Sequence, residues 1–237
     1  MKVQVLFNNE AISGDLSAGW GFSCLVNKHI LFDTGENEEY LSKNMENMGI
    51  DIRDIEAVVI SHDHWDHTGG LWKLLNARRG LKVYACPNFS RKFNKKVKEL
   101  KGRLIKADKF TKVAKGIYTT GEIQGEYKGQ GMPEQALVVK TKNGITAITG
   151  CAHPGIINIV GKIKNESPSE QFYLVFGGFH LMNKDKHTIS TIVDTFKELG
   201  IKKVGPTHCS GKEAEKIFEE KYKDNFISVK AGQILDI

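Results

Sequence analysis

The chain has 237 residues, of which 40% are apolar and 26% charged, ordinary values for a globular protein with a sizeable core. No run approaches the roughly 20 apolar residues of a membrane span, and residues 1–5 have the pattern of a strand rather than of a signal peptide. We therefore expect a cytoplasmic protein without a membrane partner. The net charge of +6 suits a small anionic substrate.

Short apolar runs bounded by turn residues predict the first strands, at residues 3–7, 22–26 and 29–32. The third run leads directly into Asp33, whose carboxylate cannot be buried without hydrogen-bond donors. We therefore expect Asp33 to hydrogen-bond the histidine-rich loop that follows, with direct metal binding as the less favoured role. Residues 41–48 have helical spacing, and Gly49 is the predicted end of this helix.

A dense cluster of histidine and aspartate follows the apolar strand predicted at residues 57–60. Alternate residues of an extended chain point to the same side, so His62 and His64 can bring their imidazoles to one metal ion. Asp66 and His67 lie beyond, where the chain turns, and would serve a second ion. Imidazole and carboxylate are ligands of zinc and iron, and a catalytic site keeps one position for water. The alternative, an inert polar loop, accounts poorly for this density beside a buried strand.

Residues 88–100 are predicted to form a basic helix. The segment at 91–103 holds seven lysine or arginine residues against one acid, Glu99. These cations would form a solvated face, because the apolar residues of the helix point inward, namely Phe93, Val97 and Leu100. Nucleic-acid binding is the alternative, and it is disfavoured because no aromatic residues that stack on bases are interleaved.

The second half of the chain places a histidine just after each of three further predicted strands, namely His153, His180 and His208. A packed core histidine would explain any single case but not the series. Amphipathic helices are predicted between and after these strands, at residues 154–164, 186–199 and 212–222. The glycine-rich loop at 121–133 is a candidate lid, with a surface excursion as the alternative.

Strands flanked by helices in two similar halves, roughly 1–120 and 121–237, predict one α/β domain over residues 1–237. Its two sheets would pack face to face with helices outside. None of the cysteines forms a C-x-x-C pair, and no disulfide framework is expected for Cys24, Cys86, Cys151 and Cys209. Cys151 and Cys209 lie near predicted ligands, so they are either small buried thiols, which we favour, or metal ligands.

The motif His62-x-His64-x-Asp66-His67, with Phe32-Asp33-Thr34-Gly35 before it, is identified as the signature of the metallo-β-lactamase superfamily. Other segments resemble its dihydropteroate-synthase-like branch: Gly21-Phe22-Ser23, Glu134-Gln135-Ala136-Leu137, Gly150-Cys151-Ala152-His153-Pro154, Gly177-Gly178-Phe179-His180 and Thr207-His208-Cys209. Archaeal members of this branch join a dihydropterin diphosphate to a ribofuranosylaminobenzene phosphate. The resemblance implies the four-layer αββα sandwich of the superfamily.

The resemblance also implies how the ligands are shared between two divalent ions. One ion would bind His62, His64 and His153, and the other would bind Asp66, His67 and His208. Zinc is the expected metal, with iron and manganese as alternatives. Many members supply a bridging carboxylate from the strand before the last ligand, whereas this chain has Gly177-Gly178-Phe179-His180 there. His180 is therefore expected to be a ligand or a substrate contact.

Three functions are compatible with these features. The first is transfer, with loss of diphosphate, on a small phosphorylated or diphosphorylated pterin-like metabolite. The second is hydrolysis of phosphodiester, thioester or lactone bonds, and the third is metal binding without catalysis. In either reaction Asp66 could act as a base as well as a ligand, and His180 as a general acid.

Overall fold

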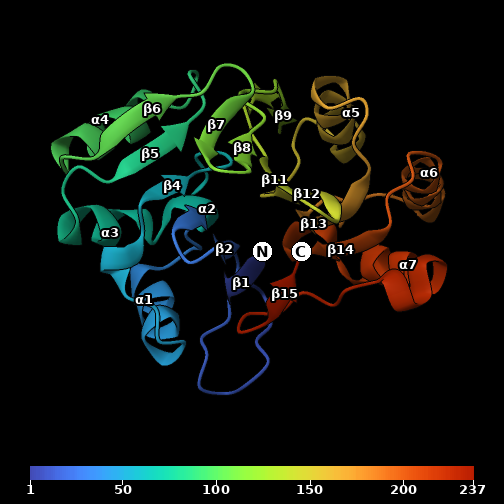
Figure 1. Cartoon of the computed structure of the whole chain (residues 1–237), viewed down its shortest axis with the longest axis horizontal. Helices are drawn as coiled ribbons and strands as arrows, with labels where there is room; N and C mark the ends of the chain where they lie inside the picture. Colours follow the sequence, from blue (N-terminus) through green and yellow to red (C-terminus); the bar gives the residue numbers. More distant parts are fainter. The chain divides into compact units, whose positions relative to one another are not determined.

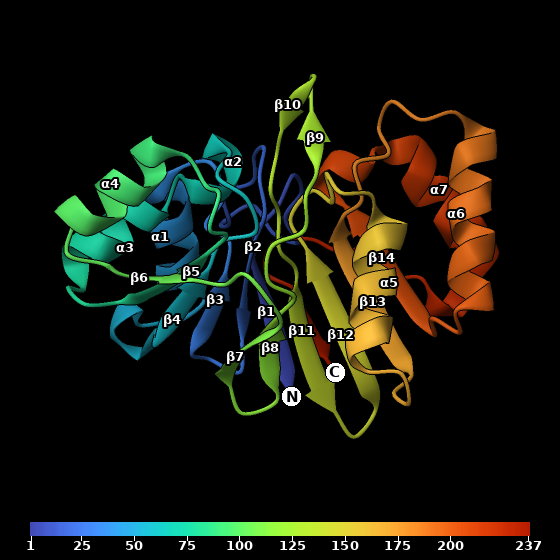
Figure 2. The same ribbon diagram turned by 90° about the horizontal axis from the view of Figure 1, so that it is seen from above.

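The computed structural model describes all of residues 1–237. The chain divides into two compact units, the first comprising residues 1–109 and 230–236 and the second residues 110–229 and 237 (Figures 1 and 2). The segment before residue 120 thus belongs in part to the second unit, and the organisation as one domain stays a prediction. None of the helices is both long enough and apolar enough to cross a membrane.

A seven-stranded sheet runs through the first unit, in the order β15-β1-β2-β3-β4-β5-β6. Its strands are β1 (Lys2–Phe7), β2 (Ser23–Val26), β3 (Ile30–Phe32), β4 (Ala57–Val59), β5 (Lys82–Ala85), β6 (Arg103–Lys106) and β15 (Ile234–Asp236). Strands β3 to β6 are parallel, so their carboxyl ends meet at one edge of the sheet. The histidine-rich loop leaves the sheet at this edge, directly after β4.

Three helices of the first unit pack on one face of this sheet, namely α1 (Glu38–Asn47), α3 (Leu71–Ala77) and α4 (Arg91–Glu99). Each buries an apolar stripe, with Leu41, Leu74 and Val97 at most 2% exposed. Burial of such a side chain contributes roughly 1.5–3 kcal/mol. The side chains of Asn37 and Ser90 accept backbone N–H groups at the starts of α1 and α4. The predicted orientation of the basic helix is confirmed.

A six-stranded sheet forms the second unit, in the order β14-β13-β12-β11-β8-β7. Its strands are β7 (Thr111–Ala114), β8 (Ile117–Thr119), β11 (Leu137–Thr141), β12 (Gly144–Thr149), β13 (Phe172–Gly178) and β14 (Lys203–Thr207). Strands β12 to β14 are parallel, and a predicted histidine ligand follows each of them. The helices of this unit are α5 (Ile156–Glu166), α6 (Lys186–Glu198) and α7 (Lys212–Tyr222). Their apolar sides share one core with the sheet, in which Phe179, Phe196 and Phe218 contact one another edge to face.

Most predicted strands and helices are present, with small shifts at their ends. The elements that sequence reasoning missed are short, namely β7, β15, α2 (Trp65–Thr68), the hairpin of β9 (Glu126–Tyr127) and β10 (Gln130–Gly131), and the 3-10 turns η1 (Ile52–Asp54), η2 (His208–Ser210) and η3 (Lys223–Asn225). Elements of two to four residues contain too little alternation to be recognised. The hairpin stands out from the sheet of the second unit in Figure 2 and occupies the loop predicted as a lid.

Candidate metal centre

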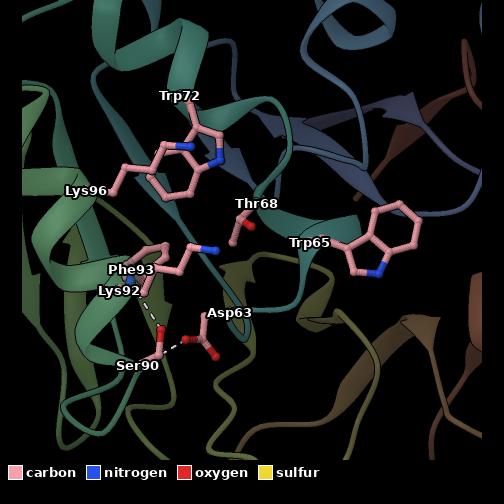
Figure 3. A pocket seen from close by; sticks show the side chains of 8 residues that line it. All are labelled: Asp63, Trp65, Thr68, Trp72, Ser90, Lys92, Phe93 and Lys96. Carbon is pink, nitrogen blue, oxygen red and sulfur yellow. Dashed lines mark hydrogen bonds between the residues drawn. The ribbon is translucent and has the colours of Figure 1, made fainter.

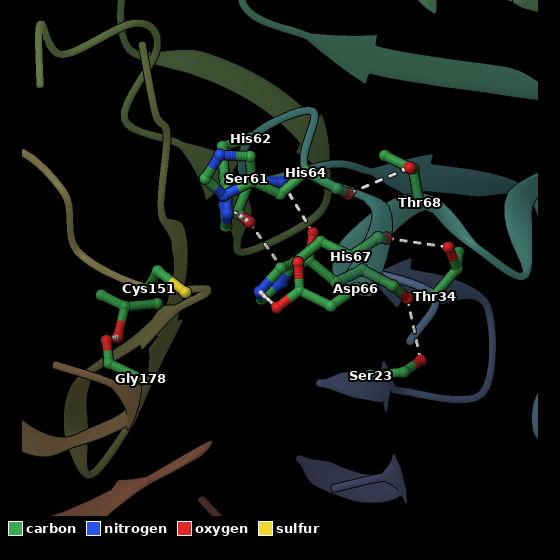
Figure 4. Close-up of polar contacts among 12 residues, drawn as sticks. Ser23, Thr34, Ser61, His62, His64, Asp66, His67, Thr68, Cys151 and Gly178 are labelled. Atoms are coloured by element: carbon green, nitrogen blue, oxygen red, sulfur yellow. Dashed lines mark hydrogen bonds and ion pairs between the residues drawn. The ribbon is translucent and has the colours of Figure 1, made fainter. Parts of the chain in front are cut away.

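The four predicted ligands of the first unit come from one short segment (Figure 4). His62 and His64 follow β4, and Asp66 and His67 lie on the one-turn helix α2. The ring centroid of His62 lies 4.8 Å from that of His64 and 4.2 Å from that of His67. Nε2 of His67 lies 3.5 Å from a carboxylate oxygen of Asp66. The structure therefore gathers all four side chains at the sheet edge.

Asp33 is fully buried and connects the end of β3 to this segment. One carboxylate oxygen accepts the backbone N–H of Ser61, and the other accepts the Ser61 hydroxyl and Nδ1–H of His67, each at 2.7 Å. Burial raises the pKa of Asp33, against the opposing effect of His67 and Ser61. Because Nδ1 of His67 is engaged in this way, Nε2 is the nitrogen that would face a metal. The predicted hydrogen-bonding role of Asp33 is confirmed.

The two glycines after α2 let this segment approach the chain at residues 34–36. A Cβ atom on Gly69 would lie 2.0 Å from the carbonyl oxygen of Glu36, and one on Gly70 would lie 2.6 Å from that of Thr34. The hydroxyl of Thr34 in turn donates to the carbonyl oxygen of His67 at 2.8 Å. Only glycine permits this approach, which holds α2 against the end of β3.

Glu134 makes a similar contact to a histidine in the second unit, and sequence reasoning gave it no role. Its buried carboxylate accepts the backbone N–H groups of Cys151, Ala152 and His153 at 2.8–2.9 Å, and Nδ1–H of His153 at 2.9 Å. Burial raises the pKa of Glu134, but the hydrogen bonds from His153 and the backbone outweigh it and lower the pKa to about 2. This ionised carboxylate fixes the loop after β12 and leaves Nε2 of His153 as the nitrogen that would face a metal.

The histidines of the second unit lie at the carboxyl ends of its parallel strands. The metal-binding atoms of Cys151, His153 and His180 all lie within 4.8 Å of one another. His208 begins η2 after β14, and it also has its metal-binding atom within 4.8 Å of that of Cys151. Tyr127 on β9 packs edgewise against His153 and His180, with ring centroids 5.3 and 5.9 Å apart. The hairpin thus contributes an aromatic wall to this cluster.

All four cysteines are buried and none forms a disulfide, and the choice between buried thiol and metal ligand for Cys151 and Cys209 stays open. Cys209 donates a weak hydrogen bond through its sulfur to the carbonyl oxygen of Cys151, at 3.6 Å. A hydrogen bond with the Cys209 thiol raises the pKa of His180. The alternative role as a ligand fits Cys151, because its sulfur lies among the histidines.

No carboxylate stands at the end of β13, where Gly177 and Gly178 lie. A Cβ atom on Gly178 would lie 2.1 Å from the carbonyl oxygen of Gly150 and 2.7 Å from the sulfur of Cys209. A side chain at this position would therefore require the backbone of the neighbouring strand end to move. His180 is the first residue after this strand end that brings a metal-binding atom to the cluster.

Comparison with known proteins identifies the relatives of this chain. It is 31% identical to the 7,8-dihydropterin-6-methyl-4-(beta-D-ribofuranosyl)-aminobenzene-5'-phosphate synthase of Methanocaldococcus jannaschii, over 89% of this chain and 85% of the synthase. An uncharacterized protein of the same archaeon is also 31% identical, over 99% of this chain and all of that protein. The solved structure of Tm1679, a metal-dependent hydrolase of the beta-lactamase superfamily, matches with a TM-score of 0.84 and 31% identity and covers 100% of this chain and 99% of that one.

These matches confirm the fold class and the branch that the motifs predicted. The profile of the metallo-beta-lactamase superfamily matches residues 23–208, which include Asp33, the histidine motif and His208. With that profile covering most of the sequence, the chain belongs to the metallo-β-lactamase superfamily.

Proposed function

We propose that this chain is a metal-dependent enzyme that acts on a small phosphorylated or diphosphorylated, pterin-like metabolite by transfer with loss of diphosphate. The observation that carries the proposal is that a buried carboxylate orients a histidine in each unit, Asp33 with His67 and Glu134 with His153. Carboxylates that orient histidines in this way are typical of metal sites. The relation to the archaeal synthase supplies the substrate class.

The donor set fits two divalent ions, zinc first and iron or manganese as alternatives. Imidazole nitrogens and a carboxylate are the ligands that these metals take in proteins. We assign His62, His64 and His153 to one ion and Asp66, His67 and His208 to the other, following the motif of the superfamily. When bound, such ions attract phosphate oxygens and stabilise negative charge on a departing diphosphate.

The protein's own residues would then position the reactants and move protons. Asp66 can accept a proton from an attacking amine as well as bind metal. His180 would be a further ligand or would donate a proton to the substrate, and its ring centroid lies 4.8 Å from that of His153. Tyr127 would limit the access of water to these two histidines, because its ring packs against both.

Hydrolysis of a phosphodiester, thioester or lactone bond is the second candidate function. It is favoured by the likeness to Tm1679, a metal-dependent hydrolase that matches this chain along its whole length. The same ligands serve either reaction, and the difference lies in whether water or an amine attacks. A protein that binds metal without catalysis is the third candidate.

Metal content per chain is the first measurement that tests the proposal. Protein purified without added metal should contain two ions per chain by elemental analysis, and His187→Ala, at an exposed histidine on α6, should contain the same number. A fall towards one ion in His180→Ala would make His180 a ligand, whereas no fall would make it a substrate contact. Fewer than one ion in the native protein, with no gain on reloading, would contradict the proposal.

Turnover by the metal-loaded protein separates the candidate reactions. We expect diphosphate release from a dihydropterin diphosphate in the presence of an aryl amine, and slower cleavage of bis(4-nitrophenyl) phosphate and of lactones. The opposite order of rates would favour the hydrolase. No turnover of any of these compounds by protein with two bound ions would favour the third candidate.

A further inference from the structure

A pocket of about 210 Å³ opens in the first unit between the histidine-rich loop and α4 (Figure 3). None of the metal ligands lines it, and no role proposed above uses it. The residues that line it combine aromatic rings, cations and one acid: Asp63, Trp65, Thr68, Trp72, Ser90, Lys92, Phe93 and Lys96. This combination of side chains indicates a narrower class of ligand than the basic charge of the helix alone would.

Two ammonium groups of this pocket lack a carboxylate partner. Lys92 and Lys96 lie one turn apart on α4, and neither forms an ion pair, whereas Lys95 on the same helix pairs with Glu99. The ammonium of Lys96 lies 4.1 Å from the centroid of the Trp72 ring. In Figure 3 the amine end of Lys92 points into the middle of the pocket. An anion that enters would therefore meet two positive charges.

Aromatic rings form much of the remaining wall. The Trp72 ring packs edgewise on Phe93 of α4, with centroids 5.8 Å apart. Trp65 is 61% exposed although indole rings are usually covered, so its flat surface remains available at the rim. A planar ring bound here would gain apolar contact with these side chains while its anionic group reached the lysines.

Part of the pocket wall comes from the same chain segment that carries the metal ligands. Asp63 lies between His62 and His64 in the sequence, and the other two lining residues of this segment, Trp65 and Thr68, flank Asp66 and His67. The carboxylate of Asp63 accepts the backbone N–H of Ser90 at 2.8 Å, which ties the loop to the start of α4. A molecule bound in this pocket would therefore lie directly beside the segment that holds the metal ligands.

We propose that this pocket binds the end of the substrate remote from the metal ions, and that this end is a single aromatic ring that carries a phosphate or another anionic group. The substrate link rests on the proposed function. The volume is below the roughly 300 Å³ at which pockets for drug-sized ligands begin, which limits the bound part to about one ring and its anion. The Asp63 carboxylate would accept an N–H or O–H from that ring.

Binding of phenylphosphonate to the full-length protein tests this inference, because the probe has one ring and one anion and is not hydrolysed. The reporter is tryptophan fluorescence in Trp20→Phe, which leaves Trp65 and Trp72 as the indoles. We expect saturable quenching by phenylphosphonate, at least tenfold weaker binding of inorganic phosphate and of phenol, and a loss of affinity in high salt. The double variant Lys92→Ala/Lys96→Ala should bind the probe at least tenfold more weakly, and Lys95→Ala/Lys98→Ala should bind it normally.

Equal binding by the two double variants would overturn the inference, as would phenylphosphonate binding no tighter than phosphate. Much tighter, length-dependent binding of an oligothymidylate would also overturn it, in favour of a nucleic-acid surface. The titration is made on metal-free protein, so it is independent of the metal analysis. If the protein fails to hold metal but binds the probe, the proposed function falls while the ligand class of the pocket stands.

Discussion

Glu134 and His153 are joined by a buried hydrogen bond of 2.9 Å between a carboxylate oxygen and Nδ1 of the imidazole. The same carboxylate accepts three backbone N–H groups of the loop that ends in His153. One side chain therefore fixes both the path of the backbone and the direction of the ring. Asp33 has the same relation to His67 in the first unit, where it also accepts donors from Ser61.

Glu134→Gln should lower both stability and metal affinity. The amide nitrogen of glutamine cannot accept hydrogen bonds, so at least one of the four donors loses its partner, at a cost on the order of 3 kcal/mol in the free energy of unfolding. Metal affinity should fall about 10–100-fold because His153 is no longer held in place. Glu170→Gln is the control, since it removes a partly exposed pair with Lys140 and should change stability by less than about 1 kcal/mol. Native metal affinity in Glu134→Gln would show that the carboxylate serves only the backbone.

Asp33 permits a sharper comparison because its backbone has a positive φ of 53°. Asparagine tolerates this conformation, so Asp33→Asn should keep the turn while it weakens the contacts to Ser61 and His67. Asp33→Ala adds backbone strain and should lower the free energy of unfolding by about 1 kcal/mol more than Asp33→Asn. Metal titration should show similar losses, about 10–100-fold, for both variants and none for the exposed Asp108→Asn. A normal affinity in Asp33→Asn would mean that orientation of His67 does not require the carboxylate.

The sequence allowed Asp33 to be predicted but not Glu134, for a physical reason. Asp33 directly follows an apolar strand, where a carboxylate needs donors, and the histidine-rich loop is the next group of them along the chain. Glu134 lies 17–19 residues before its partners, and three of the four are backbone N–H groups, which every residue except proline has. The segment Glu134-Gln135-Ala136-Leu137 was marked only by its resemblance to the branch, and nothing in it pointed to an acceptor for these donors. The parallel with Asp33 became visible only in the folded chain.

The pocket beside α4 was missed for a similar reason. The basic segment contains no interleaved aromatic residues that stack on bases, and that observation disfavoured nucleic-acid binding and left the helix as a solvated face. In the folded chain Trp72 comes from α3 and packs against Phe93, beneath the ammonium of Lys96. The ligand segment at residues 62–67 was predictable because its four side chains are neighbours in the sequence.

Tyr222 tests how burial of a hydroxyl group affects the stability of the second unit, without any involvement of metal. Its buried hydroxyl has no hydrogen-bond partner, and burial raises its pKa to about 12. Between about pH 10, the pKa of an unfolded tyrosine, and pH 12 the unfolded chain binds fewer protons than the folded one, so native stability falls as the pH rises. Tyr222→Phe should be equal to the native protein or up to about 1 kcal/mol more stable at pH 7.

The advantage of Tyr222→Phe should grow with pH. Urea unfolding should show a further gain of about 1–2 kcal/mol near pH 11.5, relative to the native protein at the same pH. Tyr40→Phe, at a residue that is 41% exposed, controls for the loss of a tyrosine as such. A pH-independent difference between Tyr222→Phe and the native protein would show that the hydroxyl is hydrated in the folded state.

Substitutions of Gly178 test whether the end of β13 has room for a carboxylate side chain. An added Cβ would lie 2.1 Å from the carbonyl oxygen of Gly150, so Gly178→Ala should lower the free energy of unfolding by at least about 2 kcal/mol. Gly161→Ala is the matched control, because it lies within α5 with nothing within 4 Å of the added atom and should stabilise by about 0.5–1 kcal/mol. Gly178→Asp, which adds the carboxylate found in many superfamily members, should be less stable still and should hold less metal. A stable Gly178→Asp with higher metal affinity would show that the strand end can accept this ligand and that His180 does not stand in for it.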